Sequence, residues 1–211
     1  MKTPVNRQAL RQHLTYSWWK YALVIVLSAF LVNLYYTVTA YHSPPEKKIE
    51  LYVYGYGNQD KIDALMEEIR VSEMPDMEDM HSALLATDET YGIMQLTTYV
   101  GAAEGDVYIL PRNNFVSMAS SGAWAPLEND AELMALLTEA GINLQSGWRR
   151  ESDSGESHLF GIPVSSLPGL SEYLSVDNGF VCVLITNGNQ ENVMRFLRIL
   201  SQRMIRPISA D

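Results

Sequence analysis

Residues 49–70, IELYVYGYGNQDKIDALMEEIR, decide the fold of this chain. Their first half is rich in β-branched and aromatic residues and ends in glycines, which is typical of a strand and a tight turn. Their second half places four apolar residues on one face of a helix, namely Ile62, Leu65, Met66 and Ile69. Asn58 precedes this helix and is its predicted N-cap. The stretch therefore predicts a strand, a turn and a helix.

The strand and helix pattern recurs along the rest of the chain. Residues 105–122 and 179–204 each contain an apolar run followed by an amphipathic run, and residues 128–141 predict a further helix. Residues 91–100, YGIMQLTTYV, predict another strand, and the polar residues 145–156 predict a surface loop. Strands that alternate with helices predict an α/β fold, with a single, mostly parallel sheet and helices on both of its faces.

An uncharged apolar stretch lies near the N-terminus. Residues 21–41 contain no charged side chain, and a helix of this length, at about 1.5 Å per residue, crosses the ~30 Å hydrocarbon layer of a membrane. Four basic residues and no acidic residue precede Glu46, so retention of positive charge predicts a cytoplasmic N-terminus. The alternative is a signal peptide that is cleaved after Ala40. We expect a single-pass cell-membrane protein whose C-terminal part lies outside the cytoplasm.

These features divide the chain into five parts. The predicted parts are a cytoplasmic basic N-terminus (1–20), a transmembrane helix (21–41), a linker (42–48), an extracytoplasmic α/β domain (49–206) and a C-terminal tail (207–211). Two adjacent prolines in the linker cannot continue the preceding helix.

Charge and composition exclude several classes of function. The four bases before Glu46 leave 11 of the 15 bases against all 25 acids, so the exported part has a net charge of −14, which argues against nucleic acid as a partner. The one cysteine, Cys182, excludes a disulfide framework within the chain. The sequence contains no G-x-S-x-G, H-E-x-x-H or phosphate-loop motif. We therefore expect a protein that is not an enzyme and has no cofactor.

Four stretches, in this order, resemble extracellular solute-binding proteins of ABC transporters. They are LYVYGYGNQDKIDALMEEI (51–69), GDVYILPRNNFVSMASSGAWAPLEND (105–130), HLFGIPVSSL (158–167) and ITNGNQENVMRFLRIL (185–200). Members of that family have two lobes and are about twice as long, so the resemblance implies a single lobe, here anchored to a bacterial membrane. It also implies that the chain binds a small solute, or that it binds a transporter subunit or another envelope protein through the surface of the lobe.

The predicted ligand site lies beyond the carboxyl ends of the strands, where open α/β sheets bind ligands. Four loops supply its residues, which are Tyr56, Asn58, Arg112, Asn113, Ser165, Ser166 and Asn187. Tyr56 offers a ring for stacking, and Arg112 offers a planar cation that suits a carboxylate or a sugar acid. The alternative is that these residues only form the turns and helix caps that strand–helix junctions require.

Two further sets of residues have a predicted role. The first set combines thioethers with an imidazole and consists of Met74, Met77, Met80 and His81. Such ligands suit Cu(I) outside the cytoplasm. The alternative is that the methionines fill gaps in the core. Trp124 and Trp148 are predicted aromatic anchors of a protein-binding surface, should the lobe bind a partner protein.

Overall fold

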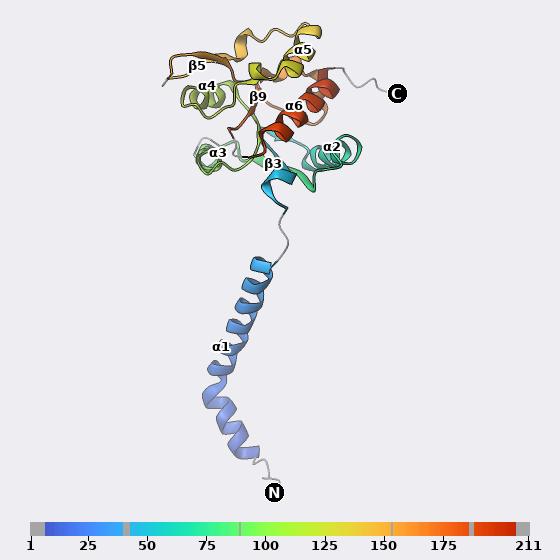
Figure 1. Cartoon of the computed structure of the whole chain (residues 1–211). Helices are drawn as coiled ribbons and strands as arrows, with labels where there is room; N and C mark the ends of the chain where they lie inside the picture. Colours follow the sequence, from blue (N-terminus) through green and yellow to red (C-terminus); the bar gives the residue numbers. More distant parts are fainter. Residues whose placement is uncertain (1–6, 40–42, 89, 153, 186–187, 206–211) are drawn as a thin grey trace. The chain divides into compact units, whose positions relative to one another are not determined.

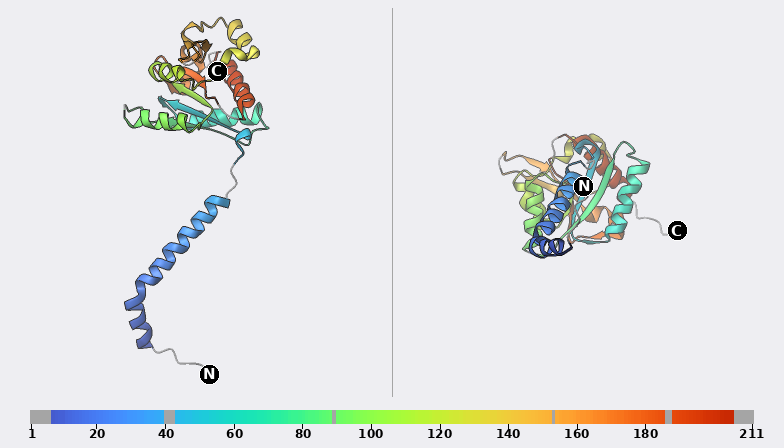
Figure 2. Two further views of the ribbon diagram at one scale, coloured as in Figure 1. Left: turned by 60° about the vertical axis from the view of Figure 1, so that its left-hand side comes forward. Right: turned by 90° about the horizontal axis from the view of Figure 1, so that it is seen from below.

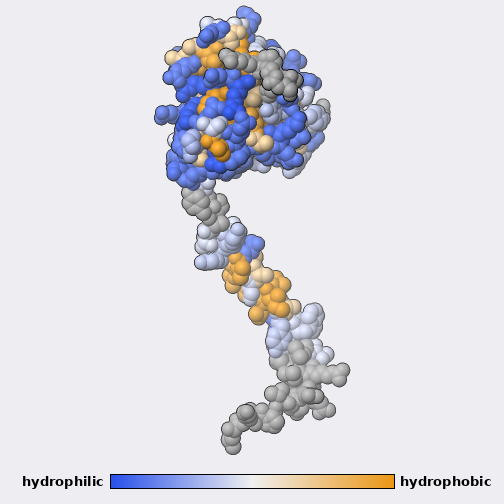
Figure 3. Space-filling view, turned by 90° about the vertical axis from the view of Figure 1, so that its right-hand side faces the viewer, coloured by the Kyte–Doolittle hydropathy of each residue, from blue (hydrophilic) through white to orange (hydrophobic). Residues whose placement is uncertain are grey.

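The computed structural model describes residues 7–39, 43–88, 90–152, 154–185 and 188–205. The chain divides into an N-terminal unit that contains helix α1 (Arg7–Thr39) and a domain that starts at Ser43 (Figure 1). Within the described residues, α1 is the one helix that is long and apolar enough to cross a membrane, through its segment Thr15–Thr37. Figure 3 shows apolar side chains around this segment. The helix thus begins well before the predicted residue 21.

The domain is built on a five-stranded sheet with the order β3-β1-β4-β9-β7. Its strands are β1 (Lys48–Tyr54), β3 (Asp79–Leu85), β4 (Val107–Leu110), β7 (Ile162–Pro163) and β9 (Phe180–Val183). Strand β1 pairs in parallel with β3 and β4, whereas β9 pairs antiparallel with both β4 and β7. Four strands therefore share one direction, and β9 alone reverses it.

Helices cover both faces of the sheet, as Figures 1 and 2 show. Helices α2 (Gln59–Ser72), α5 (Ala131–Glu139) and α6 (Gln190–Ile205) bury apolar side chains together with the odd-numbered β1 residues Ile49, Leu51 and Val53. Helices α3 (Tyr91–Gly101) and α4 (Arg112–Ser120) bury theirs together with Tyr52 and Tyr54. The alternation of side chains along β1 thus produces two cores, one on each face.

Shorter elements complete the domain. Strands β2 (Tyr56–Gly57) and β8 (Leu174–Ser175) form one antiparallel pair, and β5 (Trp148–Arg150) and β6 (Ser157–Leu159) form another. Short 3₁₀ helices span Pro45–Lys47, Leu127–Asn129, Gln145–Gly147, Val164–Ser166 and Pro168–Glu172.

Three local predictions differ from the structure. Residues 91–100 form helix α3 rather than a strand, because the Asp88 carboxylate accepts hydrogen bonds from the first amides of the helix, those of Thr90, Tyr91 and Gly92. The predicted loop 145–156 contains strand β5 and the turn that joins it to β6. The acidic methionine stretch, for which no strand was predicted, runs into strand β3 at Asp79.

Trp124 is also not the surface anchor that the sequence predicts. Its side chain is fully buried, its Nε1 donates a hydrogen bond to the Phe115 carbonyl over 3.4 Å, and its ring lies 5.5 Å from that of Tyr108. Trp148, by contrast, is 39 % exposed. Of the two tryptophans, only Trp148 is available to a partner.

Candidate functional site

Three of the four predicted ligand loops lie at one edge of the sheet. Strands β1, β4 and β7 share one direction, so their carboxyl ends meet at this edge, which we call the carboxyl edge. Here Tyr56 follows β1 and is 74 % exposed, and Arg112 and Asn113 follow β4 and begin α4. Ser165 and Ser166 follow β7 in a 3₁₀ turn. The structure thus gathers polar, accessible side chains from three strands.

The fourth predicted loop follows β9, which runs in the opposite direction. The carboxyl end of β9 therefore lies at the other edge of the sheet, the amino edge. Asn187 lies outside the described residues, but Asn189 donates a hydrogen bond to the carbonyl of Lys48 at the start of β1, over 2.6 Å. The prediction that this loop shares an edge with the other three is wrong, because the sequence pattern does not reveal the direction of a strand.

Asn58 has a structural role in addition to its place near the carboxyl edge. Its side-chain oxygen accepts a hydrogen bond from the Lys61 amide over 3.1 Å, which caps the N-terminus of α2. The backbone amide of Asn58 donates to the Tyr173 carbonyl. This geometry matches the alternative interpretation of Asn58 as a cap.

We expect Asn58→Ala to lower the free energy of unfolding by about 1 kcal/mol, because the amide of Lys61 loses its side-chain acceptor. Asn58→Asp, which retains the acceptor, should leave the stability nearly unchanged. Urea unfolding of the three proteins measures the difference. Equal stability of the alanine and aspartate variants would contradict the capping role.

Arg149 joins Arg112 beside the start of α4, although the sequence did not point to it. Its guanidinium lies over the ring of Phe115, with Cζ 5.6 Å from the ring centroid, and Phe115 is three residues beyond Arg112 in α4. Burial lowers the pKa of Arg149, and the positive charge of Arg112 lowers it further. No local sequence signal indicates this position, because Arg149 reaches it through a contact with a distant segment of the chain.

The methionine stretch is divided between the two faces of the sheet. Met74, Met77 and Met80 are at most 6 % exposed and belong to the core beneath α2 and α6. His81 lies on the opposite face of β3, where its Nε2 is 3.1 Å from Glu50 Oε1. The thioethers of this core and the imidazole are therefore not brought together.

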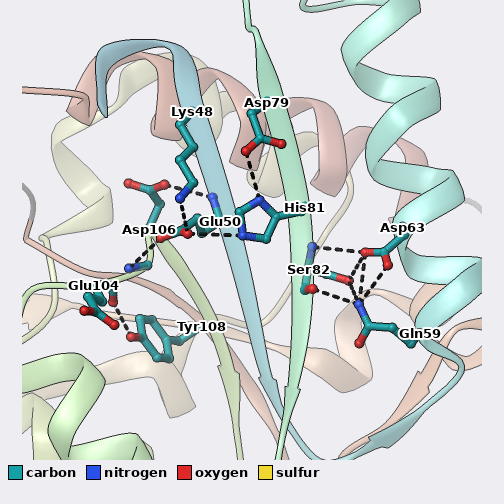
Figure 4. A network of polar contacts seen from close by, with 11 residues as sticks. Lys48, Glu50, Gln59, Asp63, Asp79, His81, Ser82, Glu104, Asp106 and Tyr108 are labelled. Atoms are coloured by element: carbon teal, nitrogen blue, oxygen red, sulfur yellow. Dashed lines mark hydrogen bonds and ion pairs between the residues drawn. The ribbon is translucent and has the colours of Figure 1, made fainter. Parts of the chain in front are cut away.

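A polar network occupies the amino edge, on the face of His81 (Figure 4). Glu50 lies beside His81 in the register of β1 and β3, and it also forms an ion pair of 2.6 Å with Lys48. Its backbone amide donates to Asp106 Oδ2 over 2.9 Å. Burial raises the pKa of Asp106 to about 6, and the charge of Glu50 contributes to this rise, whereas Lys48 and His81 oppose it. The network ties the starts of three strands together.

We expect the free energy of unfolding to fall by up to about 3 kcal/mol between pH 4 and pH 6 because of Asp106. The folded protein keeps the carboxyl proton in this range, whereas the unfolded chain, with a pKa near 3.8, releases it. The contribution is thus fully present below pH 4 and lost above pH 6. Asp106→Asn should remove it, which urea unfolding at pH 4 and pH 7 measures. A difference between the two proteins that does not vary with pH would contradict this.

Two hollows also lie at the amino edge. One, of about 350 Å³, borders the polar network and is lined in part by Lys48, Glu50 and Asp106. The other, of about 420 Å³, lies between the end of β9 and the starts of α5 and α6, and Ile185 and Met194 line it. These hollows are the alternative places for a small ligand.

A histidine–carboxylate pair lies on β6, where His158 is opposite Arg149 in the register of β5 and β6. His158 Nδ1 is 2.6 Å from Glu128 Oε1, and the other oxygen of Glu128 accepts a hydrogen bond from the Leu159 amide. No hydroxyl or thiol of the described residues forms a hydrogen bond with His158, and Cys182 is fully buried. This pair joins β6 to the turn before α5 and lacks the nucleophile that a hydrolase needs.

Comparison with known proteins gives similarities of structure alone. No family model matches the chain, and no curated protein matches it in sequence. An extracellular solute-binding protein of family 1 from Alicyclobacillus acidocaldarius matches with 16 % identity and a TM-score of 0.39, over 58 % of this chain and 29 % of that chain.

Two further solved structures match this chain with similar identities, coverages and TM-scores. A family 1 protein from Bifidobacterium longum has 19 % identity and a TM-score of 0.40, over 57 % and 28 % of the two chains. An ABC transporter solute-binding protein from Agrobacterium vitis, solved with bound D-mannitol, has 17 % identity and a TM-score of 0.36, over 55 % and 26 %. The matched part is less than a third of each of these proteins. The residues of this chain, rather than these similarities, must support any proposed function.

Proposed function

We propose that this protein is a single-pass membrane protein whose extracytoplasmic domain binds a small solute at the carboxyl edge of its sheet, without catalysis. Helix α1 is the proposed anchor, and the basic residues at the N-terminal side of its apolar segment, Lys2, Arg7, Arg11 and Lys20, keep the N-terminus in the cytoplasm. An ABC transporter or another envelope protein is the proposed recipient of the bound solute.

The observation that carries this proposal is the convergence of three loops at one edge. The ends of β1, β4 and β7 present Tyr56, Arg112 and Ser165, which are a ring, a cation and a hydroxyl. Small ligands are held by such combinations of apolar surface and a few converging polar groups. Neither of the two arginines at this edge forms an ion pair with a described carboxylate, so both can face a ligand.

A second candidate function, recognition of a partner protein, has its own observation. Helix α3 has no charged residue, in a part of the chain with a net charge of −14. Three of its large side chains are exposed by 45 % or more, namely Tyr91 (57 %), Ile93 (45 %) and Met94 (59 %). An exposed apolar surface of this kind is typical of protein contacts.

Thermal unfolding of the full chain in lipid nanodiscs tests solute binding. The panel comprises neutral sugars, sugar acids, dicarboxylates, amino acids, oligopeptides, polyamines and Cu(I). A solute present at about 100 times its dissociation constant should stabilise the fold by about 2.7 kcal/mol. A shift with one class supports the proposal, whereas a cooperative transition that no class shifts would favour the partner protein.

A further inference from the structure

Ion pairs hold most of the basic side chains of the domain. The bases in ion pairs with described carboxylates are Lys47, Lys48, Arg70, Arg195, Arg198 and Arg203. Among the described residues of the domain, Lys61 and three arginines have no such pair. These arginines are Arg112, Arg149 and Arg150, and all three lie on α4 or on the adjacent β5. In so acidic a domain, uncompensated positive charge is thus gathered in one place.

The fold holds Arg149 in position beside the first turn of α4, where Arg112 lies exposed. The ring of Phe115 supports the Arg149 guanidinium and is itself stacked on Phe180, with 4.4 Å between the ring centroids. Nη1 of Arg149 donates to the Trp148 carbonyl over 2.5 Å, whereas Nη2 is buried and has no hydrogen-bond partner among the described residues. Because the chain closes this donor off from solvent, Arg149 attracts an anion at the start of α4 through its positive charge.

The start of α4 differs from the other helix starts of the domain. Asp60, Asp88, Asp130 and Glu191 place an acidic side chain at the starts of α2, α3, α5 and α6. Helix α4 starts after Pro111, which provides no side-chain cap, and its first turn contains no acidic residue. Its first amides and the positive end of its dipole therefore add to the charge of Arg112.

We propose that Arg112 and Arg149 bind the carboxylate of a small anionic solute at the start of α4. The planar guanidinium of the exposed Arg112 can donate two parallel hydrogen bonds to a carboxylate, which a lysine cannot do. Tyr56 lies at the same edge and is free to cover an apolar part of the solute. This inference rests on the proposed solute-binding function and specifies the class of solute.

Isothermal titration calorimetry of the full chain in phosphatidylcholine nanodiscs tests the assignment. The probes are galacturonate and succinate, with galactose as the neutral counterpart and inorganic phosphate as the other anion. We expect galacturonate or succinate to bind. Arg112→Gln and Arg149→Met should each weaken that binding about tenfold to a hundredfold, the range for a lost charge-assisted hydrogen bond. The methionine retains apolar contact with Phe115.

Arg150→Gln is the matched control. It removes the same charge from the neighbouring residue of β5, whose Nε instead donates to the Gly155 carbonyl. It should change the dissociation constant less than twofold. An equal loss of affinity in the Arg150 and Arg112 variants would overturn the specific role of Arg112 and Arg149, since only the overall charge would then matter.

The remaining outcomes separate this inference from the proposed function. If galactose binds as tightly as galacturonate, the assignment of an anionic solute is wrong, whereas the proposal that the domain binds a solute stands. Binding of phosphate, without binding of galacturonate or succinate, would overturn the assignment of a carboxylate as the bound group. The absence of binding by all four probes would overturn the inference. The proposed solute binding would then be tested separately, by thermal unfolding with the neutral and cationic solutes of the wider panel.

Discussion

Trp124→Ala should lower the free energy of unfolding by about 3–5 kcal/mol, which is the cost of truncating a fully buried tryptophan. The change removes the contact with the Tyr108 ring and the hydrogen bond to the Phe115 carbonyl. It also opens a cavity in the core that α4 shares with the sheet, because the Trp124 side chain is buried there with Phe115 and Tyr108. Since a domain of this size has a total stability of about 5–15 kcal/mol, much of the domain's stability depends on this residue.

Urea unfolding followed by circular dichroism measures this effect, with Trp148→Ala as the matched control. Trp148 is 39 % exposed, so the same truncation there should cost far less. Similar losses in the two variants would show that Trp124 is not the more buried tryptophan and would contradict the described core.

Gly92→Ala should destabilise the domain by about 1–3 kcal/mol through overpacking. A Cβ at this position would lie 2.0 Å from the carbonyl oxygen of Ala86 and 3.1 Å from the hydroxyl of Tyr54. The nearest atom belongs to the backbone, so α3 itself would have to move away from the end of β3. Thermal unfolding should therefore begin at a lower temperature.

Gly101→Ala provides the control on the same helix. No atom lies within 4 Å of the Cβ that this change would add. Alanine at the end of α3 should leave the stability unchanged or raise it by less than about 1 kcal/mol. If both variants unfold at the same temperature, α3 does not pack against Ala86 as described.

The parts of the fold with strong periodicity were predictable. All four residues expected on one face of the first predicted helix, Ile62, Leu65, Met66 and Ile69, are buried in α2. In the amphipathic run predicted within residues 179–204, which forms α6, the buried residues include Val193, Phe196, Leu197 and Leu200. In both helices one face is charged and the opposite face is apolar, so the spacing of the apolar residues fits a helix and not a strand.

The errors occur where the local pattern is ambiguous. Residues 91–100 contain no charge to mark an exposed face, so an apolar run of this kind fits a strand as well as a helix. In β3, Asp79 and His81 place polar side chains beside buried ones, and the short alternation is hidden by the acidic residues that precede it. The direction of β9 depends on its partners in space, and no local signal indicates it.

The candidate site was predictable in part, for a similar reason. Arg112 follows a predicted strand directly, and its place at the carboxyl edge follows from the order of elements. Arg149 reaches the same place from β5, 37 residues later in the numbering, through a contact with Phe115. Such a contact between distant segments requires the tertiary structure.

Amide hydrogen exchange of the full chain in nanodiscs, with and without galacturonate, tests the central claim most directly. We expect slower exchange at the carboxyl edge, in residues 55–58, 112–116 and 164–166, and no change around residues 103–106 at the amino edge. Protection confined to the amino edge, near Asp106 or Ile185, would contradict the account and place the ligand in the hollows there.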